Sequence, residues 1–227
     1  MKKFLLLCLL ASFGIATARA AGKSARTSLI EQVETCEAIL REIQKNPELR
    51  PSADAWKSAK AIIITNQFKA GFIVGMKGGY GVMLVKKNDG QWSIPVLINA
   101  GEASVGLQLG ANAIETLYIL TDNATPRLLF NSRFNIGVDA KAVAGPKAAE
   151  AESNNREIIS TPVLVYTKTR GLYAGATVKA GYVSRNDQVN FTLYSTQYTL
   201  PELLYSDWVK PLPEVQPLMD YVKQLSP

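Results

Sequence analysis

The chain has 227 residues, of which 47% are hydrophobic and 19% are charged, and its formal net charge is +6. It contains no histidine, which excludes Ser-His-Asp and Cys-His catalysis within one chain and removes the commonest zinc ligand. Serine–lysine or paired-carboxylate chemistry is the remaining enzymatic alternative, but the residues it would need have only ordinary surface spacing. We therefore expect a single domain that is not an enzyme and that holds no metal or cofactor.

The first twenty residues have the pattern of a cleaved signal peptide. Lys2-Lys3 forms a basic n-region, residues 4–15 form an apolar h-region, and Ala18-Arg19-Ala20 is a small-x-small cleavage site. The apolar run is shorter than the roughly 20 residues that a membrane-spanning helix needs. We expect residues 1–20 to be removed and the protein to be exported to the periplasm. Cleavage leaves 22 basic against 19 acidic residues, a net charge of +3.

The next segment predicts two helices. Residues 21–27 are small and polar, and we expect them to be flexible. The capping box Ser28-Leu29-Ile30-Glu31 begins an amphipathic helix that ends before Pro47. Its apolar side either packs on the core of the domain or meets a membrane, and the glutamates on its polar face favour packing. Cys36 lies on that apolar side, so we expect a buried structural thiol. A short second helix is expected from Ser52 to about Ala59.

Beyond Lys60 the apolar pattern changes to short runs of β-branched and aromatic residues. The expected strands lie at residues 62–64, 72–74, 80–86, 92–98, 105–109, 114–120, 163–167 and 172–183. Asn88-Asp89-Gly90 predicts a hairpin turn. We expect a brief helix at residues 127–130 and a loop at 140–155, and prolines divide residues 200–225 into short helices.

Glycines within apolar sequence indicate the shape of the sheet. Eight of them lie in such stretches, namely Gly71, Gly75, Gly78, Gly79, Gly81, Gly101, Gly106 and Gly110. Glycine inside a strand costs roughly 0.5–1 kcal/mol relative to alanine, so we expect bulges, tight bends, or close approach of another backbone or a ligand. The predicted fold is one α+β domain with a strongly curled, mainly antiparallel sheet, either open or barrel-like. The N-terminal amphipathic helix and the C-terminal helices pack on this sheet.

Several short motifs resemble the SYLF-domain family in order and spacing, over roughly residues 40–225. They are Ala59-Lys60 before Ile62-Ile63-Ile64, Lys69-Ala70-Gly71-Phe72, Gly79-Tyr80-Gly81-Val82, Trp92-Ser93-Ile94-Pro95, residues 106–110, Gly137-Val138-Asp139, Gly145-Pro146 and residues 166–175. Met76-Lys77 and Lys147-Ala148-Ala149 depart from the family pattern. The resemblance implies a lipid-binding domain over residues 28–227, related to the yeast actin-patch Ysc-type proteins.

Six lysines and no acidic residue lie between Asp54 and Asp89. They either guard an exposed sheet edge or belong to a patch that faces anionic lipid or another polyanion. The second interpretation gives the candidate lipid-binding residues Lys69, Lys77, Lys86, Lys87, Lys168, Arg170 and Lys179. The nearby aromatic residues Phe72, Tyr80, Trp92 and Tyr173 either rest at a headgroup boundary or pack in the core.

These features predict an exported lipid-binding protein that recognises phospholipid headgroups through a basic face. It would be peripheral to a membrane and would have no nucleic-acid partner. The alternative is an envelope protein-interaction or structural module without direct lipid affinity. Vesicle binding that fades with salt would favour the first function, and salt-insensitive binding to a protein would favour the second.

Overall fold

A computed structural model of the chain describes residues 25–70, 74–105, 112–131, 133–136, 142–144, 162–170 and 181–227. The expected signal peptide at residues 1–20 lies outside these ranges, as does most of the expected strand at 172–183.

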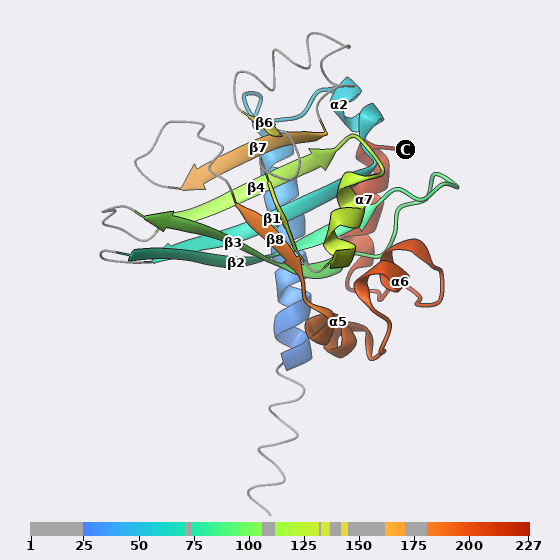
Figure 1. Ribbon diagram of the computed structural model, residues 1–227. Coiled ribbons are helices and arrows are strands. Elements are labelled where there is room, and N and C mark those ends of the chain that lie inside the picture. Colours follow the sequence, from blue (N-terminus) through green and yellow to red (C-terminus); the bar gives the residue numbers. More distant parts are fainter. Residues whose placement is uncertain are drawn as a thin grey trace, which may run out of the picture.

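A curled sheet of eight strands forms the centre of the fold, in the order β5-β8-β3-β2-β1-β4-β7-β6 (Figure 1). The strands are β1 (Ala61–Ala70), β2 (Val74–Val85), β3 (Val96–Val105), β4 (Asn112–Leu120), β5 (Arg133–Asn135), β6 (Ala142–Ala144), β7 (Val163–Arg170) and β8 (Tyr182–Arg185). The β6–β7 pair is parallel and the other neighbouring pairs are antiparallel. The predicted curled, mainly antiparallel sheet is confirmed, and it is open, because β5 and β6 form its two edges in the described part of the chain.

Helices surround one end of this sheet. They are a helix over residues 25–45, α2 (Ala53–Ser58), the 3₁₀ helix η1 (Thr125–Asn131), α5 (Asp187–Tyr194), α6 (Leu200–Tyr205) and α7 (Gln216–Leu225). In Figure 1 the helix over residues 25–45, drawn in blue, crosses the strands, while α2, α6 and α7 gather at the right of the view. The predicted N-terminal and C-terminal helices are therefore confirmed, whereas α5 was not expected.

The helix over residues 25–45 packs on the domain core. Its buried side chains recur at helical spacing, namely Leu29, Val33, Cys36, Ile39, Leu40 and Ile43. This confirms that the apolar side packs internally. The helix already includes residues 25–27, so the start expected at Ser28 is wrong.

The first half of β1 is buried on both faces. Ile62, Ile63 and Ile64 have no exposed surface, and successive strand residues point to opposite faces. The Cys36 thiol donates to the Ile64 carbonyl oxygen at 3.7 Å. Burial raises the pKa of Cys36 to about 12. The thiol therefore stays protonated at neutral pH, and the expected buried structural cysteine is confirmed.

The neighbouring strands β1 and β2 approach closely at two glycines. A Cβ atom on Gly79 would lie 2.2 Å from the carbonyl oxygen of Asn66, and one on Gly81 would lie 2.4 Å from that of Ile64. No other residue has room at these two positions, so close approach of another backbone is the reason for both glycines. Because β1 and β2 are central in the sheet, the interpretation of the lysine run as an edge guard is wrong.

The expected hairpin turn joins β2 to β3. Gly90 has φ +82° and its N–H donates to the Lys87 carbonyl oxygen at 3.0 Å, which is a conformation that glycine adopts without strain. Trp92 forms one isolated bridge with Lys86, and β3 begins at Val96 rather than at Trp92. Pro95 directly precedes it and has no N–H for the ladder.

Candidate functional site: a basic pocket beside the β2–β3 hairpin

The predicted lipid-binding cations do not gather in one place. Lys86 and Lys87 follow the end of β2, whereas Lys69 and Lys77 are register partners near the other end of the β1–β2 pair. At ~3.3 Å per residue, the nine steps from Lys77 to Lys86 span ~30 Å. Arg170 ends β7, at the same end of the sheet as Lys69.

Lys168 is engaged within the fold, and Lys179 lies outside the described residues. The Lys168 ammonium group forms an ion pair with Glu42, on the helix over residues 25–45, and lies 3.4 Å from Glu115 Oε2. Glu115 is only 5% exposed. Since a buried carboxylate needs a nearby positive charge, this geometry gives Lys168 a structural role.

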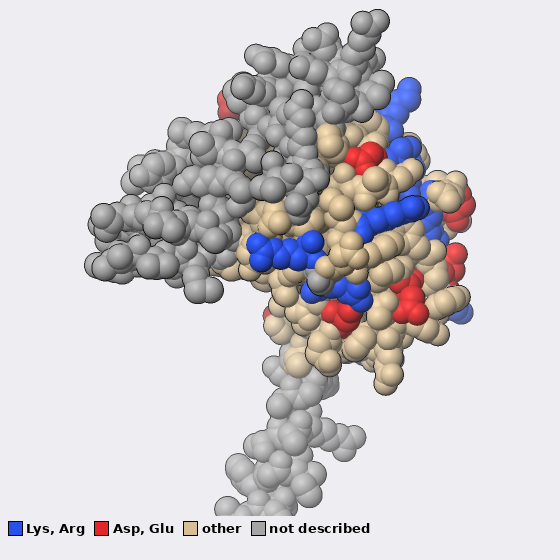
Figure 2. Space-filling model, in the orientation of Figure 1, with Lys and Arg blue, Asp and Glu red and all other residues tan. Residues whose placement is uncertain are grey.

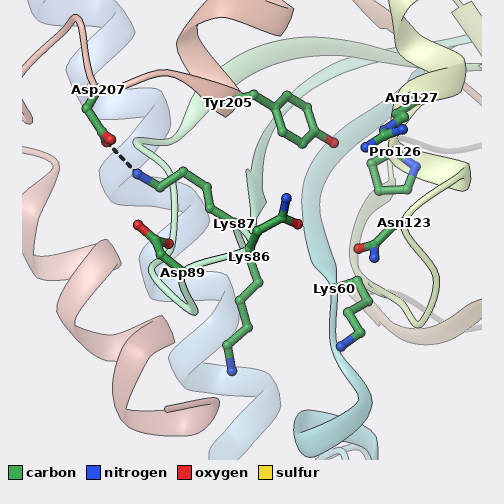
Figure 3. Close-up of a pocket in the computed structure, with 10 residues that line it drawn as sticks. Lys60, Lys86, Lys87, Asp89, Asn123, Pro126, Arg127, Tyr205 and Asp207 are labelled. Carbon is green, nitrogen blue, oxygen red and sulfur yellow. Dashed lines mark hydrogen bonds and ion pairs between the residues drawn. The ribbon is translucent and has the colours of Figure 1, made fainter.

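Lys86 and Lys87 line a surface pocket of about 270 Å³. Its lining residues are Lys60, Lys86, Lys87, Asn88, Asp89, Asn123, Pro126, Arg127, Tyr205 and Asp207. They come from the ends of β1 and β2, the hairpin turn, η1 and the C-terminal end of α6 (Figure 3). Four of these side chains are basic and two are acidic. Because a water molecule takes up about 30 Å³ in the liquid, the pocket has room for a small hydrated anion.

Backbone hydrogen bonds fix the strand ends that carry two of the lysines. The Lys86 N–H donates to the Lys60 carbonyl oxygen at 2.8 Å, and the Lys60 N–H donates to that of Leu120 at 2.7 Å. In Figure 3 the Lys60 and Lys86 side chains extend in a similar direction. The pKa of Lys86 is lowered, first by desolvation and then by repulsion from Lys60. A bound anion would relieve this repulsion.

A capped turn places Arg127, the basic residue of η1, at the pocket. The Asp122 carboxylate accepts from the N–H of Ala124 at 2.7 Å and from that of Thr125 at 2.6 Å. This arrangement satisfies free N–H groups where the helix begins. It positions Arg127, whose guanidinium carbon lies 6.0 Å from the centroid of the Tyr205 ring. Figure 3 shows the Tyr205 hydroxyl directed toward Arg127.

Tyr205 is itself held against η1. Its ring packs edge-on against Phe130, with 5.6 Å between the centroids. Burial raises the pKa of Tyr205, and the hydrogen bond and charge of Arg127 oppose this rise. The hydroxyl therefore remains a neutral hydrogen-bonding group at neutral pH.

An ion pair crosses the mouth of the pocket. Lys87 pairs with Asp207 (Figure 3), and the side chain of Asp207 is 83% exposed. The Lys87 side chain is only 11% exposed, but solvent at Asp207 screens the pair, which is therefore worth about 1 kcal/mol or less. Lys60 and Arg127 form no ion pair with any residue in the described ranges. The pocket thus contains cations that are available to an anionic ligand.

Sequence reasoning had not assigned Lys60, Arg127 or Tyr205 to the site. Lys60 belongs to the acid-free lysine run, and its position before β1 places it opposite Lys86 once the two strands pair. The expected pairing of the two strands could therefore have predicted Lys60 as a pocket residue. No sequence feature could have predicted Arg127 or Tyr205, because only tertiary packing brings η1 and α6 to the hairpin.

Two of the four aromatic residues that were expected either at a headgroup boundary or in the core lie in the described part of the chain. Trp92 is 7% exposed and its Nε1 donates to the Ser226 carbonyl oxygen at 2.8 Å, so its core interpretation is confirmed. Tyr80 is partly buried and accepts a hydrogen bond from Asn66 at 3.2 Å. Phe72 and Tyr173 lie outside the described residues.

Figure 2 shows Lys and Arg side chains together with Asp and Glu side chains on the right of the view, where η1, α6 and the hairpin lie in Figure 1. Within the described ranges, no helix has the length and apolar character needed to cross a bilayer. The same part of the chain holds no cluster of acidic and cysteine side chains suited to a metal ion.

The curled sheet, its helices and the pocket define a single α+β domain with a surface pocket lined by four basic and two acidic side chains. Residues 101–225, more than half of the chain, match the Ysc84 family, described as "Las17-binding protein actin regulator". The chain belongs to this family. It is the SYLF-domain family that the short sequence motifs resemble.

Three relatives are longer proteins, and the chain matches only part of each. The bovine and human proteins named SH3 domain-containing YSC84-like protein 1 are 27% and 26% identical over 191 residues, which cover 82% of this chain and 56% of theirs. LAS seventeen-binding protein 3 of Saccharomyces cerevisiae is 29% identical over 168 residues, or 73% of this chain and 36% of its own. The yeast name describes a binding protein, and none of the three names describes an enzyme. The chain thus spans about half the length of these mammalian relatives, and no solved structure was found to match it.

Proposed function

We propose that this protein binds the phosphate-bearing headgroups of anionic phospholipids at a membrane surface, through the pocket beside the β2–β3 hairpin. The observation that carries the proposal is the set of four basic side chains, Lys60, Lys86, Lys87 and Arg127, around one pocket. Lys and Arg are the side chains that bind phosphate oxygens, as a point charge and as a planar fork respectively. The protein acts by binding, without catalysis.

The first test compares two double variants with equal loss of charge. Lys60→Gln/Arg127→Gln removes two pocket cations that form no ion pair with any described residue, while Lys45→Gln/Arg50→Gln removes one lysine and one arginine that are exposed elsewhere. Each cation near an anionic leaflet is worth ~1 kcal/mol, so the pocket variant should bind phosphatidylglycerol vesicles roughly 30-fold more weakly. The measurement is co-sedimentation at low and moderate salt, with phosphatidylcholine vesicles as the neutral surface. Equal losses in both variants would reject the pocket as the site.

A protein-interaction or structural module without lipid affinity is the second candidate. It is favoured by the relative named LAS seventeen-binding protein 3, whose name states that it binds another protein. An intact fold that binds neither vesicle type, yet retains a protein from an envelope extract at high salt, would favour this candidate.

We also propose that the protein is exported and acts in the periplasm, since residues 1–20 have the three regions of a signal peptide. Mass spectrometry of the protein from a periplasmic fraction should give a chain that begins at Ala21. Recovery of the uncleaved chain from the cytoplasm would contradict this proposal.

A further inference from the structure

An exposed pair of aromatic rings lies beside the pocket. Trp208 is 64% exposed and Tyr198 is 37% exposed, and their ring centroids are 5.1 Å apart at an interplanar angle of 50°. Trp56 and Trp92, the other two tryptophans of the chain, are only 4% and 7% exposed. Trp208 therefore differs from both in facing solvent.

The helix α6, which lies between Tyr198 and Trp208 in the sequence, is held firmly in the fold. Tyr198 precedes α6 and Trp208 follows it. At the start of α6, Thr199 and Glu202 form a capping box, and the Leu200 N–H donates to Asp187 at 2.9 Å. Leu200, Leu203 and Leu204 are buried in the core. A helix fixed at its start and along its buried side holds the two rings at a defined place on the surface.

The same segment forms part of the pocket wall. Tyr205 and Asp207 both line the pocket, and Trp208 directly follows Asp207, whose carboxylate pairs with Lys87. The exposed Trp208 ring is therefore joined to the pocket wall through consecutive residues of the chain. A lipid whose phosphate occupies the pocket would bring its surroundings close to Trp208.

We infer that Trp208 and Tyr198 enter the interfacial layer of the bilayer while the adjacent pocket holds a lipid phosphate. This inference rests on the proposed function. Tryptophan and tyrosine favour the membrane–water interface, because each has an apolar ring and a polar group that stays hydrated. A basic site beside them matches the negative surface of anionic lipid. The loop after α6 is thus the membrane-facing element of the domain.

The size of the aromatic pair favours a lipid surface over a protein partner. A stable protein interface buries about 800 Å² on each side, whereas a fully buried aromatic side chain contributes about 150–250 Å². Ser206, Asp207 and Lys210 around Trp208 are polar, and Val209 is partly buried against the core, so the apolar area in this described region is much smaller than such an interface. A bilayer needs no matching partner surface, and two rings beside a cationic pocket suffice for reversible attachment.

The test uses the fluorescence of Trp208 with phosphatidylglycerol vesicles whose acyl chains carry bromine, a short-range quencher. Wild-type protein should show a blue shift and quenching on binding. In Trp208→Phe the remaining emission comes from the buried Trp56 and Trp92 and should be unchanged. Binding of the wild type without quenching of Trp208 would overturn this inference and leave the proposed function standing. Absence of binding to any vesicle would reject both.

A second readout separates the rings from the pocket. Trp208→Ala should weaken vesicle binding roughly tenfold without changing its salt dependence, whereas Lys60→Gln/Arg127→Gln should reduce the salt dependence itself. The matched control is Phe68→Ala, since Phe68 is 54% exposed and lies near the other end of β1 from Lys60. Equal weakening by Phe68→Ala would contradict a specific role for Trp208. Because Trp208 is exposed, its variants should keep the wild-type thermal midpoint.

Discussion

The N–H of Lys86 donates to the carbonyl oxygen of Lys60 at 2.8 Å, so two lysines from separate strands lie side by side at the pocket. Partial burial lowers the pKa of Lys86, and the charge of the nearby Lys60 lowers it further. The protonated form of Lys86 is thus less favourable in the folded protein than in the unfolded chain. Unfolding takes up a proton in the pH range between the folded pKa and the usual value of 10.5, so stability rises with pH across that range.

The pKa of Lys86 should respond to its neighbour and to a ligand. Lys60→Gln should raise it only part of the way to its usual value, because desolvation is the larger cause and remains. Inorganic phosphate should also raise it, since a bound anion favours the charged form. Titration of the lysine side-chain signals by NMR measures both effects, and Lys57→Gln is the control. An unchanged pKa in Lys60→Gln would show that the two ammonium groups do not interact.

If the pocket binds a lipid phosphate as proposed, the Asp207 carboxylate competes with that phosphate for Lys87. Asp207→Asn should therefore increase the affinity for phosphatidylglycerol vesicles by about fivefold, the equivalent of ~1 kcal/mol for one charge. Stability should change by less than about 1 kcal/mol, because the Asp207 side chain is 83% exposed. Glu34→Gln, at an exposed position outside the pocket, makes the same change in net charge. If both variants gain equally, only the net charge matters.

Lys168 should matter for stability and not for lipid binding. Lys168→Met removes the positive charge beside the buried Glu115, and breaking such a pair costs about 3 kcal/mol. Urea unfolding should show this loss, while Lys45→Met at an exposed position should leave the midpoint nearly unchanged. At temperatures where it is folded, Lys168→Met should bind vesicles like the wild type. A large loss of vesicle binding in the folded variant would show that Lys168 does contribute to lipid binding.

Two adjacent glycines offer a matched test of the close strand approach. Gly79→Ala would place a Cβ atom 2.2 Å from the Asn66 carbonyl oxygen, whereas a Cβ atom on Gly78 meets nothing within 4 Å. We expect Gly79→Ala to lower the free energy of unfolding by about 3 kcal/mol. Gly78→Ala should be neutral or slightly stabilising, by about 0.5 kcal/mol. Similar losses in both variants, measured by urea unfolding, would contradict this explanation.

Local sequence features predicted much of the fold. The β-branched run at residues 62–64 and the Asn88-Asp89-Gly90 turn signal strands and a hairpin through short-range preferences, and both are present. The glycines indicated bends or close approach of another backbone, and Gly79 and Gly81 lie where β1 and β2 approach closely. These features depend on neighbouring residues, which is why the sequence alone reveals them.

The order of the strands and the content of the pocket depend on distant residues. Pairing of β1 with β4 makes β1 central, and no local pattern distinguishes a central strand that carries lysines from an edge strand. The pocket joins the hairpin to η1 and α6, so Arg127 and Tyr205 become site residues only after tertiary packing. Of the predicted cations, Lys86 and Lys87 lie in the pocket because they directly precede the turn that helps to form it.

The central position of β1 also bears on how fast the chain folds. β1 pairs with the nearby β2 but also with β4, and β3 pairs with β8, which brings Ile98 opposite Arg185. Sheets built from such long-range pairs form slowly, typically in milliseconds to seconds, because long loops must close before the contacts form. A newly made chain would remain unfolded for that time, which is compatible with the proposed export, since an exported chain passes through a narrow channel before it folds.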